Sequence, residues 1–315
     1  MQPLLAFKIT VQSRLTNYKI IMHYVITGSI GHTGKPITEG LVQAGHTVTV
    51  VTSKPDNRAA IEALGAKAAV GTVEDADFVK QAFAGADAVY LVIPPKWGVT
   101  EWRAFQNGIT DNYIAAIRAN DIRFAVLLSS IGAHMGNGAG PVDGLYDAEQ
   151  KLAQVEGLSN KFLRPSYFMY NLFNMIGMVK GAGIMGGNFG DDVVALTHTN
   201  DIADVALAEL LNLNFTGHQI RYIASDERTG PEIAKVLGEA VGKPETPWVV
   251  FSDEQNTQGM LQAGLNEEMA TQYTKLGQAL RDGLMQADYM ANKPAFGKVK
   301  LEEFAKNEFA PAFNA

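Results

Sequence analysis

The sequence predicts a doubly wound α/β fold, and three observations support this prediction. Short runs rich in Val, Ile and Leu alternate with amphipathic stretches from Met22 to about Pro165. The runs are apolar throughout, which is typical of strands buried on both faces of a parallel sheet. A glycine-containing turn joins the first run to the first amphipathic stretch. Strands and helices that alternate in this way indicate a parallel sheet with helices on both faces.

The apolar runs are the predicted strands, at residues 22–27, 46–51, 66–71, 87–93, 123–130 and 160–165. The amphipathic stretches between them predict helices at residues 34–45, 57–65, 75–85, 99–121 and 144–157. Each strand is followed by a helix that can cross back over the sheet, so successive strands can run parallel.

The first turn has the glycine spacing of a dinucleotide site. Gly28, Gly31 and Gly34 follow a strand and open a helix. The first glycine permits a tight turn, the second lets backbone approach a pyrophosphate, and the third lets helix and strand pack closely. The helix N-terminus attracts phosphate. We therefore predict a Rossmann dinucleotide site, the alternative being a purely structural turn.

The end of the second strand indicates which dinucleotide binds. An NAD site places a carboxylate there to bind the adenosine 2′-hydroxyl. This chain instead has Ser53, Lys54 and Arg58, a hydroxyl and two cations that suit a 2′-phosphate. Asp56 lies between the cations and opposes them. We predict NADP(H), the alternative being a solvated loop that is basic by chance.

The chain divides into two predicted parts. Regular alternation ends after Pro165, beyond which aromatic, methionine-rich and glycine-rich segments precede a helix at 197–212 and a strand at 218–225. We predict a Rossmann domain at 22–165 with contributions from about 193–225, and a smaller, mostly helical substrate lobe at 166–192 and 226–315. In the helix at 197–212, Asp201 and Asp204 are expected to serve capping and solvation.

The first 21 residues are expected to lie outside the fold. They contain Lys8, Arg14 and Lys19 and no acidic residue, as transit peptides do. They lack an apolar core with a cleavage site, however, and Met22 directly precedes the first strand. An upstream start codon is therefore preferred over a targeting signal.

Composition argues against several other functions. The net charge of −7, without long basic runs, argues against direct nucleic-acid binding. The 315 residues include no cysteine, so redox chemistry requires a bound cofactor, and a reducing, cytoplasmic location fits. No run reaches the ~18 apolar residues of a membrane span. The scattered histidines lack metal-ligand spacing, so no metal is expected.

Together these motifs resemble the NmrA-like branch of the atypical short-chain dehydrogenase/reductases. The matching segments are TGSIGHTG at 27–34, the basic residues after the second strand, LRPSYFMYNLF at 163–173, NDIADVA at 200–206 and the stretch at 225–244. The resemblance extends from Met22 nearly to the C-terminus. It implies a Rossmann fold that binds NADPH, in proteins that are either reductases of quinones and related electrophiles or non-catalytic redox sensors.

The turn, the strand ends and this resemblance together predict the contact residues. The expected cofactor contacts are Thr27, Gly28, Ser29, Ile30, Gly31, His32, Thr33, Gly34, Ser53, Lys54, Arg58, Thr72, Val73, Ile93, Pro94, Ser129 and Pro165. Thr72 replaces an Asp common in the family. The expected substrate pocket comprises Pro95, Trp97, Tyr167, Phe168, Tyr170 and Asn171, for which core packing is the alternative.

The catalytic pair of the wider superfamily is missing. Short-chain dehydrogenases use Tyr-x-x-x-Lys, in which the lysine lowers the tyrosine pKa. Here Tyr146 and Lys151 are five residues apart, which turns their side chains away from each other. Tyr146 and Ser129 remain candidates, with ordinary packing as the alternative for the tyrosine.

A quinone needs no strong acid, because water can protonate the oxygen formed after hydride transfer. We therefore expect an NADPH-dependent reductase of quinone-like or small conjugated carbonyl substrates. The alternative is a non-catalytic NADP(H)-binding redox sensor that acts through a protein partner. A homodimer is compatible with either function.

Overall fold

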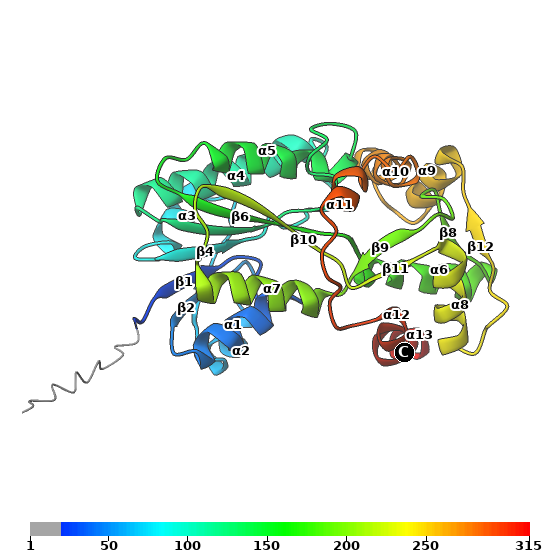
Figure 1. Ribbon diagram of the computed structural model, residues 1–315, viewed down its shortest axis with the longest axis horizontal. Coiled ribbons are helices and arrows are strands. Elements are labelled where there is room, and N and C mark those ends of the chain that lie inside the picture. The colour runs from blue at the N-terminus through cyan, green and yellow to red at the C-terminus, as the bar shows by residue number, and fades with distance from the viewer. Residues whose placement is uncertain (1–19) are drawn as a thin grey trace, which may run out of the picture.

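The structure is a computed structural model that describes residues 20–315, so the extension predicted at residues 1–21 lies almost entirely outside the described residues. Within residues 20–315, seven parallel strands form the central sheet in the order β10-β6-β5-β4-β1-β2-β3 (Figure 1). These strands are β1 (His23–Ile26), β2 (Thr47–Thr52), β3 (Lys67–Val70), β4 (Ala88–Leu91), β5 (Phe124–Leu128), β6 (Ser159–Pro165) and β10 (His218–Ile223). The strand order reverses between β1 and β4, and such a reversal opens a ligand crevice at the carboxyl ends of the strands.

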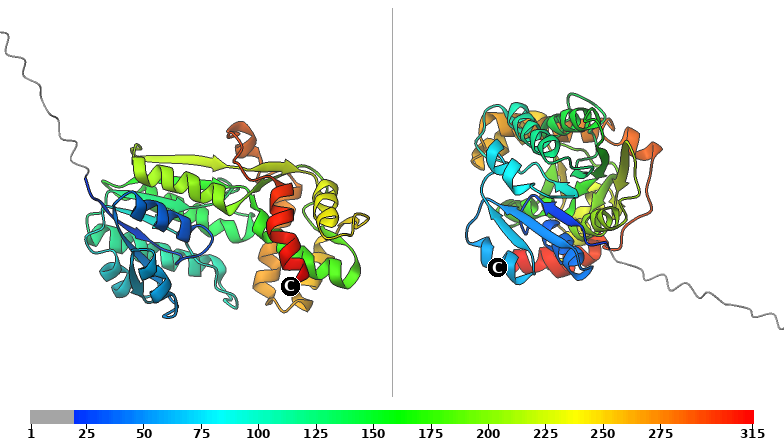
Figure 2. Two further views of the ribbon diagram at one scale, coloured as in Figure 1. Left: turned by 90° about the horizontal axis from the view of Figure 1, so that it is seen from below. Right: turned by 90° about the vertical axis from the view of Figure 1, so that its left-hand side faces the viewer.

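Helices cover both faces of the sheet, which confirms the predicted doubly wound fold (Figures 1 and 2). Their bounds are α1 (Gly34–Gln43), α2 (Asn57–Ala63), α3 (Ala76–Ala82), α4 (Trp102–Ala119), α5 (Asp143–Ala153) and α7 (Thr199–Asn212). Tyr24 and Ile26 pack in the core cluster that includes residues of α1, α2 and α7, whereas Val25 packs in the one that includes residues of α3, α4 and α5. Successive strand residues point to opposite faces, so β1 is apolar throughout because both of its faces are buried.

The second part of the chain forms a lobe at the carboxyl side of the sheet. Its elements are β7 (Tyr167–Phe168), η2 (Met169–Asn174), α6 (Met175–Ala182), β8 (Met185–Gly187), β9 (Val194–Thr197), β11 (Asp226–Arg228), α8 (Gly230–Ala240), β12 (Trp248–Val250), α9 (Asp253–Gln262), α10 (Glu267–Arg281), α11 (Ala287–Ala291), α12 (Leu301–Phe304), η3 (Ala305–Phe309) and α13 (Ala310–Asn314). The short helix η1 (Gly140–Val142), which precedes α5, packs against α10 of this lobe. Within the region predicted at about 193–225, α7 and β10 join the central sheet and its helical layer. By contrast, β9 pairs with β7 and β11 in a small separate sheet.

Asp201 and Asp204 tie the C-terminal segment to α7, which the sequence did not predict. The buried Asp201 carboxylate accepts hydrogen bonds from Ser225 Oγ at 2.6 Å and from the backbone N of Lys298 at 2.9 Å. Asp204 pairs with Lys298 Nζ at 2.6 Å. The expected capping role of Asp201 is wrong, because His198 caps α7 through its ring nitrogen.

Candidate cofactor and substrate site

The glycine turn combines two tightly packed glycines with one that has free space. Gly28 has φ +86°, and a Cβ there would lie 3.1 Å from Val92 carbons. A Cβ on Gly34 would lie 2.0 Å from the carbonyl oxygen of Ser29, so this position has no room for a side chain. The nearest atom to a Cβ on Gly31 is Gly28 O, at 3.4 Å. The fold therefore does not require glycine at position 31, and the free space suits a phosphate group beside backbone amides.

A hydrogen-bonded cluster locks this turn to the end of β2. Ser29, with φ +62°, donates from Oγ to Thr52 Oγ1 at 2.9 Å. Asn57 Nδ2 donates to Ser29 Oγ at 2.9 Å and to Thr52 Oγ1 at 3.2 Å. The positive φ of Ser29 is unfavourable for most residues, and the cluster stabilises it. Sequence reasoning missed Asn57, which carries no motif of its own.

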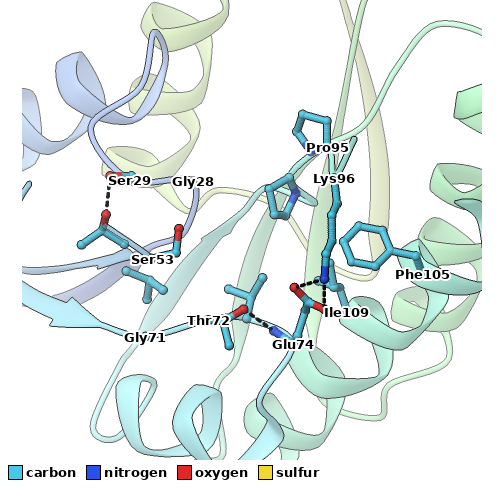
Figure 3. A pocket seen from close by; sticks show the side chains of 14 residues that line it. Gly28, Ser29, Ser53, Gly71, Thr72, Glu74, Pro95, Lys96, Phe105 and Ile109 are labelled. Atoms are coloured by element: carbon cyan, nitrogen blue, oxygen red, sulfur yellow. Dashed lines mark hydrogen bonds and ion pairs between the residues drawn. The ribbon is translucent and has the colours of Figure 1, made fainter. Parts of the chain in front are cut away.

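A cavity of about 340 Å³ lies beside the turn, at the carboxyl ends of β1, β2 and β3 (Figure 3). Six of the predicted cofactor residues line it: Gly28, Ser29, Ser53, Thr72, Val73 and Pro94. Pro95, expected in the substrate pocket, lines this cavity as well. Glu74 and Lys96 also line the cavity, and Lys96 Nζ lies 2.7 Å from Glu74 Oε2. Both side chains are about half exposed, so this ion pair joins the loops after β3 and β4 at the surface.

Lys54 and Arg58 are exposed and do not line the cavity. The Arg58 guanidinium lies 3.7 Å from Glu62 Oε1, one helical turn away. Asp56, which was expected to oppose the two cations, is exposed too. The uncharged cluster of Ser29, Thr52 and Asn57 therefore lies nearest the turn. The two cations lie outside the cavity lining, on exposed side chains.

The other predicted cofactor residues are mostly structural supports of the turn. Thr27 Oγ1 accepts from Val92 N at 2.7 Å and donates to Tyr90 O at 3.1 Å. Thr33 Oγ1 accepts from Tyr90 OH at 3.3 Å. Ile30, Ile93 and Pro165 are partly or fully buried, with Pro165 as the last residue of β6.

Ser129, at the end of β5, is only 3% exposed, and its hydroxyl is engaged in a buried network. Ser129 Oγ donates to Glu149 Oε1 at 2.5 Å, and Arg164 Nη2 donates to Glu149 Oε2 at 2.5 Å. A buried carboxylate requires such a partner. Glu149, held by Arg164, thus orients the Ser129 hydroxyl. No motif in the sequence predicts the contact between Ser129 and Glu149.

Tyr146 and Lys151 of α5 make separate contacts. Lys151 Nζ bonds Asp111 Oδ1 of α4 at 2.8 Å. Gly136 lies beside the Tyr146 ring, since a Cβ on it would be 3.4 Å from the phenol carbon Cζ. Lysine is therefore not available to this tyrosine, and any catalytic role of Tyr146 or Ser129 stays a prediction.

Aromatic residues gather beyond the turn. The His32 ring, from the turn, lies 4.4 Å from the ring of Tyr170 in η2. Tyr167, directly after β6, lies 5.7 Å from Phe189. Burial raises the pKa of the Tyr167 phenol, and the nearby phenol of Tyr273 raises it further. His32, a predicted cofactor contact, thus meets Tyr170, a predicted substrate-pocket residue, beyond the carboxyl ends of β1 and β6.

The remaining substrate candidates differ in exposure. Phe168 packs partly into the core beside α1 and α7, and Asn171 is partly buried in η2. Trp97 is 62% exposed and stacks on Tyr273 of α10. Sequence reasoning missed Tyr273, which lies within an ordinary amphipathic helix.

Within residues 20–315, no group of three or more His, Asp or Glu side chains is arranged to hold a metal ion. No helix in the same range is both long and apolar enough to cross a membrane.

Comparisons with known proteins identify the family of this chain. Residues 28–212 match the model of a family described as NAD(P)H-binding. An NAD(P)H azoreductase from Xenophilus azovorans is 24% identical over 254 residues, which cover 80% of this chain and 85% of the relative. A (4-alkanoyl-5-oxo-2,5-dihydrofuran-3-yl)methyl phosphate reductase from Streptomyces griseus is 24% identical over 220 residues, which cover 70% of this chain and 74% of the relative.

Solved structures share the fold. An NADPH-dependent quinone oxidoreductase from Escherichia coli, in complex with NADPH, matches with a TM-score of 0.77 at 19% identity, covering 91% of this chain and 99% of that one. A triphenylmethane reductase from Citrobacter sp. matches with a TM-score of 0.76 at 16% identity, covering 92% and 99%. NmrA, a negative transcriptional regulator solved with NADP, matches with a TM-score of 0.71 at 13% identity, covering 93% and 97%. The NmrA-like resemblance read from the sequence is thereby confirmed at the level of the fold.

Proposed function

The chain belongs to the NAD(P)H-binding family, and on that premise we propose that it is an NADPH-dependent reductase of quinone-like or small conjugated carbonyl acceptors. One observation carries the proposal. The aromatic rings of Trp97 and Tyr273 stack on each other, Tyr167 packs on Phe189, and Lys151 of α5 pairs with Asp111 and not with Tyr146. Such a site suits flat acceptors that need positioning more than acid catalysis.

The residues present fit a dinucleotide. Gly31 leaves room beside the turn for a pyrophosphate, and Thr72 and Val73 line the cavity where an adenine would lie. Ser53 lines the same cavity at the end of β2, in place of the carboxylate that binds the 2′-hydroxyl in NAD sites. Lys54 and Arg58 can reach this point from the surface, which favours NADPH over NADH.

Bound NADPH supplies a hydride to the acceptor. The chain holds the acceptor against the cofactor and excludes competing geometries, which is the main contribution that a hydride transfer requires. The hydride and one proton from water convert a quinone to its hydroquinone. Because burial raises the pKa of the Tyr167 phenol, this group stays protonated at neutral pH and can donate a hydrogen bond to a substrate oxygen.

The named activities of similar proteins support this substrate class. The azoreductase, the quinone oxidoreductase and the triphenylmethane reductase have names that refer to conjugated, electron-accepting substrates.

NADPH oxidation, followed at 340 nm against a panel of quinones, enals and azo dyes, tests the proposal. Turnover with at least one acceptor, and faster oxidation of NADPH than of NADH, is the expected result. Absence of turnover with every acceptor would refute the reductase proposal.

A redox sensor is the second candidate, because the NmrA fold is shared over most of the chain. A sensor would bind NADP(H) in a calorimetric titration while it fails to turn over in the same panel. The two candidates thus give opposite results in one pair of measurements.

A further inference from the structure

The loop after β4 is fastened to α10 of the lobe. Asn266 Nδ2, at the N-terminus of α10, donates to the backbone carbonyl of Val99 at 3.0 Å. The rings of Trp97 and Tyr273 lie 6.1 Å apart between centroids and are tilted by only 19°. Trp97 next to the sheet and Tyr273, 176 residues later in the chain, therefore present two nearly parallel rings.

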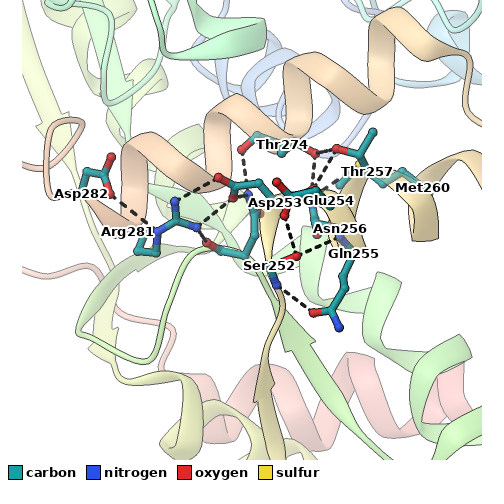
Figure 4. Close-up of polar contacts among 11 residues, drawn as sticks. Ser252, Asp253, Glu254, Gln255, Asn256, Thr257, Met260, Thr274, Arg281 and Asp282 are labelled. Carbon is teal, nitrogen blue, oxygen red and sulfur yellow. Dashed lines mark hydrogen bonds and ion pairs between the residues drawn. The ribbon is translucent and has the colours of Figure 1, made fainter.

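Polar contacts hold the C-terminal half of α10 against neighbouring elements (Figure 4). Arg281 makes two hydrogen bonds to the Asp253 carboxylate, at 2.8 and 3.2 Å. Asn188 Nδ2 donates to Thr274 O at 2.8 Å, and a Cβ on Gly277 would collide with the Asn188 side chain at 1.9 Å. Contacts on both sides of Tyr273 thus keep α10 in one place, as a preorganised site requires.

The pair of rings points to a flat ligand. Trp97 is 62% exposed, so its indole leaves a large apolar surface uncovered next to the half-buried phenol of Tyr273. Aromatic rings bind other flat rings through offset stacking. Burial raises the pKa of the Tyr273 phenol, and this group also raises the pKa of the Tyr167 phenol.

We propose that Trp97 and Tyr273 form an aromatic platform that selects planar acceptors with more than one ring, and that Tyr273 is a specificity-determining residue. The inference rests on the proposed reductase function. In this proposal, α10, a helix outside the dinucleotide domain, provides part of the surface that distinguishes a fused-ring acceptor from a single-ring one.

Two quinones with the same reacting ring test the platform. 1,4-Naphthoquinone carries a second fused ring that 1,4-benzoquinone lacks, so the ratio of their kcat/KM values isolates contacts to that second ring. Trp97→Ala and Tyr273→Ala should each lower the ratio by about 3- to 10-fold, the size of a lost stacking contact. Tyr273→Phe keeps the ring and should retain the ratio. Phe296→Ala is the matched control, because Phe296 is also exposed (42%) and its ring lies beside the ammonium groups of Lys293 and Lys300 instead of a second aromatic ring of α10.

The other outcomes are decisive as well. An unchanged ratio in Trp97→Ala and Tyr273→Ala overturns the platform, and so does an equal loss for both quinones, which would indicate a merely structural role. If the wild type reduces neither quinone, the reductase proposal fails, and calorimetric titration of the NADP⁺-saturated protein with 1,4-naphthoquinone decides the platform alone. Weaker binding in both alanine variants then supports it, and unchanged or absent binding in the wild type and variants overturns it.

Discussion

Gly31 and Gly34 provide the sharpest test of the cofactor site, because the structure separates their roles. A methyl group on Gly31 would meet only Gly28 O, at 3.4 Å, which is an ordinary van der Waals contact. Gly31→Ala should therefore change the free energy of unfolding by no more than about 0.5 kcal/mol. The same methyl would occupy the free space that we assign to the pyrophosphate.

The expected loss of NADPH affinity follows from the hydrogen bonds that a displaced phosphate forfeits. One hydrogen bond to a charged group contributes about 1.5–3 kcal/mol, so losing one raises the Kd about 10- to 150-fold. The larger Gly31→Val should abolish measurable binding. Gly34→Ala is the contrasting variant, because its Cβ would lie 2.0 Å from Ser29 O. Backbone must shift to admit it, which should lower the free energy of unfolding by about 1–3 kcal/mol.

Urea denaturation and calorimetric titration with NADPH measure the two effects separately. We expect Gly31→Ala to be stable and to bind weakly, and Gly34→Ala to be destabilised. Wild-type NADPH affinity in Gly31→Ala or Gly31→Val would refute our assignment of the pyrophosphate to this turn. A large loss of stability in Gly31→Ala would show instead that the glycine serves the fold.

Three further predictions concern specificity, catalysis and acid stability. The double variant Lys54→Ala, Arg58→Ala should lose about 30-fold of the preference for NADPH over NADH, because two exposed cations contribute about 1 kcal/mol each. Dissociation constants for both cofactors measure this loss, and a wild type that prefers NADH would contradict it. Tyr146→Phe should keep kcat within about tenfold of the wild type, since a general acid typically contributes about 100-fold or more; a larger decrease in NADPH oxidation would identify this phenol as the proton donor. The hydrogen bond from Arg281 holds the pKa of Asp253 below its usual value, so its carboxylate stabilises the fold above about pH 4 and this stability is lost as pH falls through the lower folded pKa. Asp253→Asn should therefore be less stable at pH 7 and show a smaller loss on acidification in urea titrations, whereas acid sensitivity equal to the wild type would be evidence against the clamp.

Features determined by neighbouring residues could be predicted from the sequence alone. The strand, turn and helix at 22–45 form from a continuous pattern of apolar residues and glycines, and the alternation continues to Pro165. Because parallel strands place their carboxyl ends at one edge, the same pattern also indicated that residues after β1, β2 and β4 would meet there. The positions of the glycine turn and of Ser53 could be predicted in this way.

Contacts between distant segments were decided only by the tertiary structure. Ser129 was predicted to contact the cofactor and to be a catalytic candidate, yet its hydroxyl donates to Glu149 of α5, whose carboxylate also accepts from Arg164 of β6. Pro95 was predicted to line the substrate pocket, yet it lines the same cavity as Pro94 and the glycine turn. Asn57 and Tyr273 carry no motif. Asn57 acquires its partners only when the start of α2 meets the glycine turn, and Tyr273 only when α10 meets the loop after β4. A pattern along the chain reports which face of an element is buried, whereas the identity of the partner depends on how whole elements pack against one another.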